Sequence, residues 1–167
     1  MAQRKQTNRR KAKHKKPPPV KTATDILLQR VHKNGVFHDH VIMVQTPGVV
    51  KLSAVLLEYA KPYMELSDDP ESKRTALRAA IVAWNLALTP RLATDDALNE
   101  IMTKALGRIP ETHKAAYYRR ELRDMIARKN SLFAHDDRLV LDYEITFVNG
   151  ELRLAVVSKP LHEFAKE

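Results

Sequence analysis

The fold is decided by residues 138–158, RLVLDYEITFVNGELRLAVVS, near the C-terminus. Asn149-Gly150 is the dipeptide typical of a two-residue type I′ turn, and polarity alternates along the chain on both sides of it. Such a turn pairs Ile145 with Leu154 and gathers the large apolar residues of both strands on one face. A slip of one residue would mix the two faces, so the alternation fixes the register. The other predicted pairs are Val148–Glu151, Phe147–Leu152, Thr146–Arg153, Glu144–Ala155, Tyr143–Val156 and Asp142–Val157.

The apolar face of this hairpin needs a partner layer, because two strands alone are marginally stable in water. Apolar residues upstream recur at spacings of three and four, and start and stop signals bound them. They predict helices over about 22–33, 46–61, 69–88, 94–107 and 110–130. The sequence therefore predicts an α+β fold, with about four or five helices packed on a small antiparallel sheet. That sheet includes the C-terminal β-hairpin, at about 138–148 and 151–158.

Two further features concern the sheet and the helix starts. Residues 36–45 alternate and are rich in β-branched residues, which makes them a candidate third strand. Thr46-Pro47 and Asp69-Pro70 each place a capping residue before a proline at the first helical position, so a helix is predicted after both. Pro62 is predicted to end or kink the first of these helices.

The helix over 69–88 is predicted to be central, because its second half is apolar nearly all round. Trp84 lies on its main stripe and is expected in the core, with Asn85 at the flank; lining a pocket is the alternative for this pair. The helix over 110–130 has one inward stripe, made of Ala115, Tyr118, Leu122, Met125 and Ile126.

Charge divides the chain into two parts. The 167 residues hold 29 Lys and Arg against 20 Asp and Glu, a net charge of +9. Nine of the basic residues and none of the acids lie in residues 1–21, so residues 22–167 have 29 − 9 = 20 basic and 20 acidic groups and no net charge. The sequence predicts a disordered polybasic arm at 1–21 with a Pro-rich spacer, followed by a single globular domain at 22–167.

The arm is expected to bind polyphosphate backbones, because each Lys or Arg that meets a phosphate releases condensed counterions. It contains no aromatic residue for base stacking, so its contacts should be directed to the backbone and not to sequence. A solubilising tail, a nuclear-import signal and a segment that binds an anionic membrane or an acidic protein are the alternatives. The predicted phosphate contacts are Arg4, Lys5, Arg9, Arg10, Lys11, Lys13, Lys15 and Lys16.

The helix over 110–130 supplies the second candidate for nucleic-acid contact. Arg119, Arg120 and Arg123 lie close together in the sequence, near Lys114, with Tyr117 as a candidate stacking residue. The alternative is a solvated helix, since Arg120, Asp124 and Arg128 fall at successive i,i+4 positions and would link their charges.

A metal site and an acid–base site are weaker candidates. His38 and His40 lie two apart on a predicted strand and would share a face, with Asp136 or Asp137 completing a hydrolytic metal centre. Histidines exposed at a strand end are the alternative. His135 with Asp136 and Asp137 is either an acid–base group or a polar turn in which an aspartate bonds its own backbone.

Several classes of function are disfavoured. The chain has no cysteine, which removes disulfides and thiolate metal sites, and it lacks Gly-rich phosphate loops and the GxSxG and HExxH motifs. No stretch is apolar enough to cross a membrane, and no apolar segment follows the cationic start as in a signal peptide. No cofactor and no membrane partner are predicted, and the expected location is the cytoplasm, or the nucleus of a eukaryotic host.

The sequence thus predicts a small non-enzymatic accessory protein that associates with nucleic acid, with RNA preferred to DNA because no helix-turn-helix is apparent. The arm would contact phosphates, and the neutral body would dock on a protein partner. A protein-interaction or regulatory module with a solubilising or targeting tail is the first alternative. A metal-dependent hydrolase built on His38 and His40 is the second.

Overall fold

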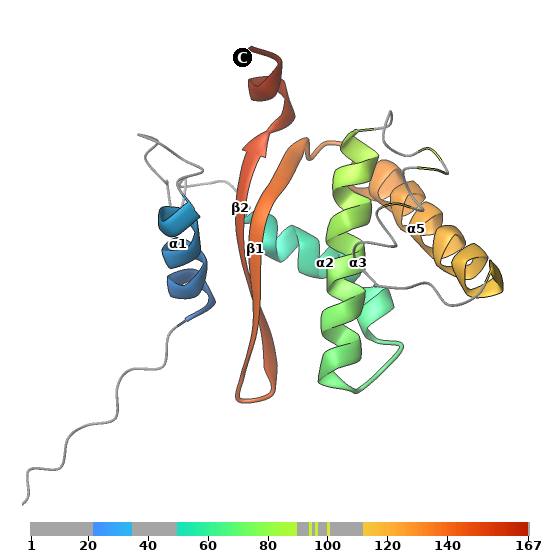
Figure 1. Cartoon of the computed structure of the whole chain (residues 1–167), viewed down its shortest axis with the longest axis horizontal. Helices are drawn as coiled ribbons and strands as arrows, with labels where there is room; N and C mark the ends of the chain where they lie inside the picture. Colours follow the sequence, from blue (N-terminus) through green and yellow to red (C-terminus); the bar gives the residue numbers. More distant parts are fainter. Residues whose placement is uncertain are drawn as a thin grey trace, which may run out of the picture.

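The structure, a computed structural model, describes residues 22–34, 50–89 and 112–166, together with Thr94, Asp96 and Glu100. These residues form an α+β fold in which four helices pack on a C-terminal two-stranded hairpin, as the sequence predicts (Figure 1). The elements are α1 (Ala23–Asn34), α2 (Leu52–Met64), α3 (Pro70–Leu88), α5 (Thr112–Leu132), β1 (Arg138–Val148), β2 (Glu151–Pro160) and a terminal 3-10 helix, η2 (Leu161–Lys166).

The hairpin has the predicted turn and the predicted register. Asn149 and Gly150 both have positive φ, 53° and 81°, as a type I′ turn requires. A Cβ on Gly150 would meet nothing within 4 Å, so its backbone angle and not lack of space favours glycine there. All seven predicted pairs, from Val148–Glu151 to Asp142–Val157, are observed. Past them the register shifts between Val140 and Asp142, and this β-bulge was not predicted.

One face of the hairpin packs on the main core. Ile145 is buried there, and Tyr143, Leu152, Leu154 and Val156 pack against the same cluster. Trp84 of α3 and Tyr59 of α2 are fully buried at its centre, with their rings 5.4 Å apart in an edge-to-face arrangement. The predicted central position of α3 is confirmed, because α3 contacts α2, α5 and β1.

The opposite face of the hairpin is covered by α1, which Figure 1 shows on the far side of the strands from α2, α3 and α5. A small second cluster joins Leu27 and Val31 of α1 to Ala155 of β2. Thr22 caps α1 reciprocally with Asp25: the Thr22 hydroxyl accepts from the Asp25 N–H, and the Thr22 N–H donates to the carboxylate. The sequence predicted both α1 and a mostly polar face, but not that one covers the other.

The start of α3 is as predicted, whereas the bounds of α2 are not. Asp69 accepts from the Ser72 N–H at 2.7 Å, and Pro70 opens α3. The prediction that α2 begins at Pro47 is wrong, because the helix begins at Leu52 after an extended Lys51 that makes no side-chain cap. Burial of Leu52, Leu56 and other residues of its inner face holds α2 in place from that point.

The end of α2 also differs from the prediction. The helix runs to Met64 with Pro62 inside its last turn, three residues beyond the predicted end. Only one N–H is lost at that proline, and the Glu65 N–H still donates to the Lys61 carbonyl at 3.0 Å.

The candidate strand at 36–45, the Thr46-Pro47 cap and most of the helix predicted over 94–107 lie outside the described residues. Within the described ranges, no helix has the length and apolar character needed to span a membrane.

Candidate nucleic-acid interface

The candidate interface lies on α5, and the inner side of that helix positions it. Leu122 and Met125 are 6% and 5% exposed, and they hold the middle of α5 against the main core. The Tyr59 hydroxyl donates to the Met125 carbonyl at 2.9 Å and ties α5 to α2. Burial is the main cause that raises the pKa of Tyr59 well above its ordinary value, so this phenol stays a donor. The outer side of α5 is therefore held in a fixed orientation.

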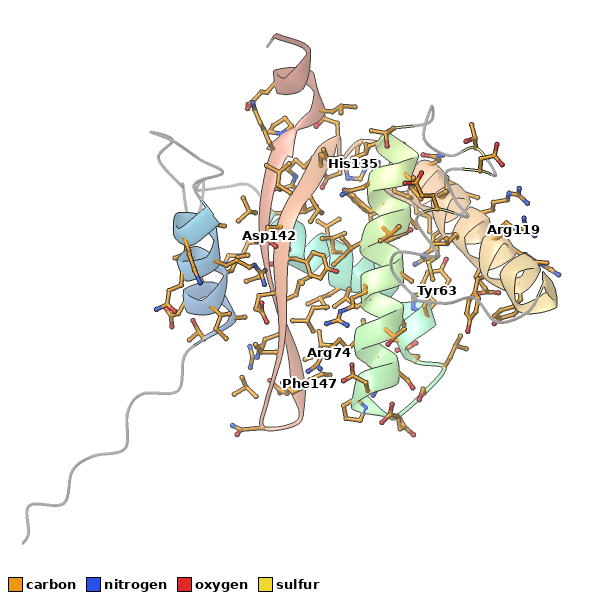
Figure 2. The ribbon with its side chains drawn as sticks, in the orientation of Figure 1. Tyr63, Arg74, Arg119, His135, Asp142 and Phe147 are labelled. Carbon is orange, nitrogen blue, oxygen red and sulfur yellow. The ribbon has the colours of Figure 1, made fainter. Side chains whose placement is uncertain are left out.

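The outer side of α5 carries the predicted arginines. Arg119, Arg120 and Arg123 fall on one helical stripe, with Arg120 and Arg123 exposed and Arg119 half-buried. Figure 2 places Arg119 on the side of α5 that faces away from α3. Residues 112–132 contain six Lys and Arg against two acids, a net charge of 6 − 2 = +4. A positive helix is thus present in a body whose net charge is zero.

Only part of the predicted row of linked charges on α5 is present. Arg120 Nε lies 4.0 Å from Asp124 Oδ2, and both side chains are largely exposed, so this pair contributes little stability. Arg128 does not continue the row. Its Nε donates to the Tyr59 carbonyl at 3.2 Å, and its guanidinium lies 5.9 Å from the centre of the Phe133 ring. Arg128 therefore packs α5 on α2, whereas Arg120 and Arg123 are exposed.

Two neighbouring tyrosines lie on the same half of α5, and the first of them, Tyr117, is three residues before Arg120. Tyr117 is 58% exposed and Tyr118 is 40% exposed, and their ring centres lie 5.6 Å apart at an interplanar angle of 70°. The prediction that Tyr118 points into the core is wrong. Tyr118 shares the helical face of Leu122 and Met125, but in the sequence it is about one turn nearer the N-terminal end of α5, and Figure 1 shows that end farther from α3 than the C-terminal end. The ring is consequently left partly in solvent.

The remaining predicted site residues lie outside the described residues. They are Arg4, Lys5, Arg9, Arg10, Lys11, Lys13, Lys15 and Lys16 of the arm, and the candidate metal ligands His38 and His40. The structure therefore brings together only the three arginines of α5 from the predicted set. Among the residues with a described placement, no group of three or more His, Asp or Glu side chains is arranged to hold a metal ion.

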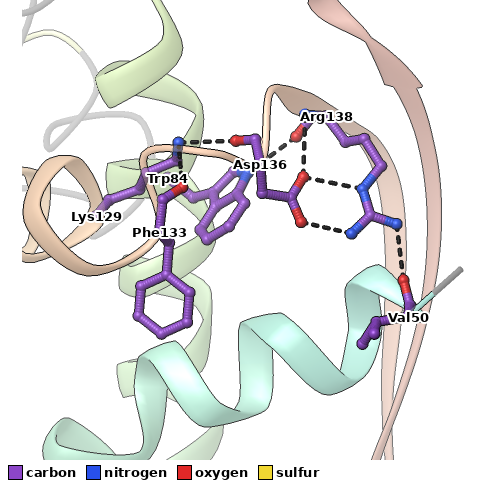
Figure 3. A network of polar contacts seen from close by, with 6 residues as sticks. All are labelled: Val50, Trp84, Lys129, Phe133, Asp136 and Arg138. Carbon is purple, nitrogen blue, oxygen red and sulfur yellow. Dashed lines mark hydrogen bonds and ion pairs between the residues drawn. The ribbon is translucent and has the colours of Figure 1, made fainter.

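The segment His135-Asp136-Asp137 is a structural turn that enters β1. The Arg138 N–H donates to Asp136 Oδ1 at 3.2 Å, which is the predicted aspartate turn. The Arg138 guanidinium binds both oxygens of the same carboxylate and also donates to the Val50 carbonyl at 2.9 Å (Figure 3). His135 is not part of this network, and Asp137 instead faces His162, with Oδ2 and Nδ1 3.2 Å apart. Arg138, held in place by Asp136, therefore ties the base of the hairpin to the chain entering α2.

A buried lysine completes this turn. Lys129 is 2% exposed, and its Nζ donates to the carbonyls of Phe133 and Asp136 at 3.0 and 2.8 Å (Figure 3). The same Nζ lies 4.8 Å from the centre of the Trp84 ring. Burial lowers the pKa of Lys129, partly offset by the nearby charge of Asp136. These contacts hold the turn that follows α5 and pack it on α3, so they explain Lys129 as a structural residue.

A shallow groove of about 620 Å³ lies beside this turn. Apolar side chains form much of its wall, and two of them, Val50 and Leu132, are 65% and 56% exposed. Glu58, His135 and Asp137 stand among them. The groove has the character of a docking surface rather than of an enclosed small-molecule site.

Comparison with protein-family models, with curated proteins and with solved structures finds no match for this chain.

Sequence reasoning missed three features of the site and its supports. Helical periodicity placed Tyr118 inside, because periodicity reports the side of a helix and not where its neighbours end. The burial of Lys129 was missed, and the only clue to it in the sequence was its i+4 spacing from Met125 on the inward side. The local charge of α5 was visible in the sequence but was hidden in the sum over the whole body.

Proposed function

We propose that this protein is a small non-enzymatic accessory protein that associates with nucleic acid. The observation that carries the proposal is the outer surface of α5, where exposed Tyr117 lies next to Arg120, with exposed Tyr118 and the further cations Arg119 and Arg123 on the same half of the helix. Cations that neutralise phosphates and aromatic faces that accept bases are the two components of nucleic-acid binding surfaces. In this proposal the arm supplies further phosphate contacts, and the rest of the body docks on a protein partner.

Salt dependence is the physical signature of this function. If about six of the nine cations of the arm engaged phosphates, affinity would fall on the order of a thousandfold between 50 and 200 mM salt. The arm alone would give such binding without sequence preference. The α5 surface adds a second site on the folded body, so binding would not depend on the arm alone.

RNA is the preferred ligand, and the cytoplasm, or the nucleus of a eukaryotic host, is the proposed location. Double-stranded DNA is usually recognised by a helix that enters the major groove with polar side chains directed at base edges. The exposed part of α5 carries aromatic rings and arginines instead, which suit stacking and phosphate contact.

The proposal is tested by the salt dependence of binding of the full chain to a fluorescein-labelled 20-nucleotide RNA. We expect the variant R119Q/R120Q/R123Q, and separately the arm variant R9Q/R10Q/K11Q, to reduce the slope of log affinity against log salt. On a single strand, the slope should fall by about 0.7 for each phosphate that the variant no longer neutralises.

A matched control separates a local surface from total charge. The variant K33Q/K61Q/R78Q removes the same charge from three exposed cations on α1, α2 and α3. It should retain a slope closer to that of the wild type. If all three variants bind alike, or if the wild type does not bind RNA at low salt, the proposed function is wrong.

A protein-interaction module is the second candidate, and the groove beside the His135–Arg138 turn favours it. Val50 and Leu132 present apolar surface there that the described part of the fold leaves exposed. The two functions are compatible, since α5 and the groove involve different residues. The variant V50E/L132E tests this candidate. We expect it to lose binding partners recovered from the native host while RNA affinity in the purified protein is unchanged.

A further inference from the structure

We infer that the Tyr117–Tyr118 surface of α5 stacks on unpaired bases, so that the nucleic acid this protein binds is single-stranded. The inference rests on the proposed function and narrows it from nucleic acid in general to one structural class. The geometry of the two rings, the position of the arginines and the accessibility of bases in the two classes of nucleic acid support it.

The two rings are placed for contact with a ligand rather than for packing. Tyr59 shows the other use of tyrosine in this fold: it is fully buried, its ring touches Trp84, and its hydroxyl is hydrogen-bonded to Met125. Tyr117 and Tyr118 instead contact each other edge to face and keep 58% and 40% of their surface in solvent. An edge-to-face pair leaves ring surface uncovered, and every nucleobase can stack on such a surface.

One arginine, Arg120, lies next to Tyr117 on the exposed side of the helix. Arg120 follows Tyr117 by three residues, which places the two side chains next to each other on the helix surface. Arg119 and Arg123, one turn apart, continue the positive stripe for about 6 Å along the axis. A single strand that stacks a base on Tyr117 would therefore bring a phosphate to Arg120, and Arg123 lies further round the helix toward its inner side.

A duplex cannot use the same surface fully. Its bases are already stacked on one another, and access for a tyrosine ring requires unstacking that costs a few kcal/mol per step. Only the arginines would contribute to duplex binding, through phosphates. Unpaired bases are free to stack, which is why aromatic residues recur where proteins bind single strands.

The experiment compares the full chain on a labelled U20 single strand and on a labelled 20-base-pair RNA duplex at the same salt. We expect Y117A/Y118A to weaken binding of the single strand by about 5- to 100-fold, since stacking contributes about 1–3 kcal/mol per base. Duplex affinity should change by less than about twofold. The control Y117F/Y118F keeps both rings and should bind the single strand nearly as the wild type does. Trp84 is the only tryptophan and is buried, so its emission reports whether each variant is folded.

The outcomes are distinguishable. Equal loss on single strand and duplex, or no loss on either, overturns the inference and leaves the proposed function standing. Wild-type protein that binds neither RNA defeats the proposed function itself. Equal binding of poly-glutamate and U20 at the same salt also overturns the inference, because the surface would then select charge alone.

Discussion

The two faces of the hairpin are held by different physics. The face toward α2 and α3 is apolar, with Ile145 only 7% exposed within the main core. On the face toward α1, one arginine joins two acids. Arg30 of α1 donates to both oxygens of Asp142 and to Glu144 Oε2, at 2.8 to 2.9 Å, and also to the Tyr143 carbonyl.

The polar face of a strand is therefore not necessarily exposed to solvent. Alternation predicted correctly which residues of the hairpin would share a side. It did not predict that α1 would cover the polar side, because the covering is carried by Arg30 and by a small cluster around Leu27, Val31 and Ala155. Its hydrogen bonds to Asp142 are the main cause that raises the pKa of Arg30, so this guanidinium remains charged at every accessible pH.

The largest effect should come from a charge on the apolar face. Ile145→Asp places a carboxylate without a cationic partner inside the main core, and we expect a loss of at least about 3 kcal/mol in the free energy of unfolding. Urea denaturation followed by Trp84 emission measures it. Val148→Asp, which introduces the same residue at a 42% exposed position on the opposite face, is the matched control and should cost far less. Equal losses would show that the two faces do not differ.

A smaller loss should follow from removing a polar contact on the apolar side. The Asn85 side chain donates to the Val140 carbonyl at 2.8 Å and accepts from the Val140 N–H at 2.9 Å. Asn85→Leu leaves both backbone groups without these bonds, and we expect a loss of about 2–4 kcal/mol. Urea denaturation again provides the value. A neutral result would show that Val140 finds other partners and that Asn85 does not hold β1 on α3.

The α1 face should respond more weakly still. Arg30→Met removes the link to Asp142 and Glu144, whose side chains are 32% and 21% exposed, as against 38% for the arginine. We expect a loss of about 1–2 kcal/mol, because solvent screens this pairing in part. Amide hydrogen exchange should show α1 losing protection while α3 keeps it. Lys33→Met, an exposed cation of the same helix, is the control, and an equal effect from it would contradict a specific role for Arg30.

The sequence predicted the fold where the deciding interactions are local. Asn149-Gly150 determines its own turn, and Asp69-Pro70 starts α3 with a cap three residues from its partner. The start of α2 was predicted wrongly because Thr46-Pro47 carries a valid local signal, whereas burial of the helix begins at Leu52. Contacts between distant residues, such as Arg30 with Glu144, leave no mark in the spacing of either one.

The same limit explains how much of the candidate site was predictable. Arg119, Arg120 and Arg123 were identified because a cluster of like charges is visible in sequence order. Tyr117 was identified as their neighbour. The exposure of Tyr118 depends on which helices pack around it, and the period of a single helix does not report this.

The smallest expected effect is a change of stability with pH, and it should arise from the Asp136–Arg138 pair at the base of the hairpin. Burial alone would raise the pKa of Asp136, but the hydrogen bonds and charge of Arg138, aided by Lys129, outweigh it and lower that pKa. A carboxyl whose pKa is lower in the folded state stabilises the fold above its unfolded pKa of about 3.9. This stability is lost as the pH falls through the folded pKa.

We therefore expect the difference in thermal midpoint between wild type and Asp136→Asn to be largest near neutral pH and to shrink below about pH 4. Asp69, whose pKa is lowered by hydrogen bonds from Ser72, titrates in both proteins and cancels from the difference. A difference that stays constant from pH 7 to pH 3 would show that the Asp136–Arg138 contact acts through shape and not charge.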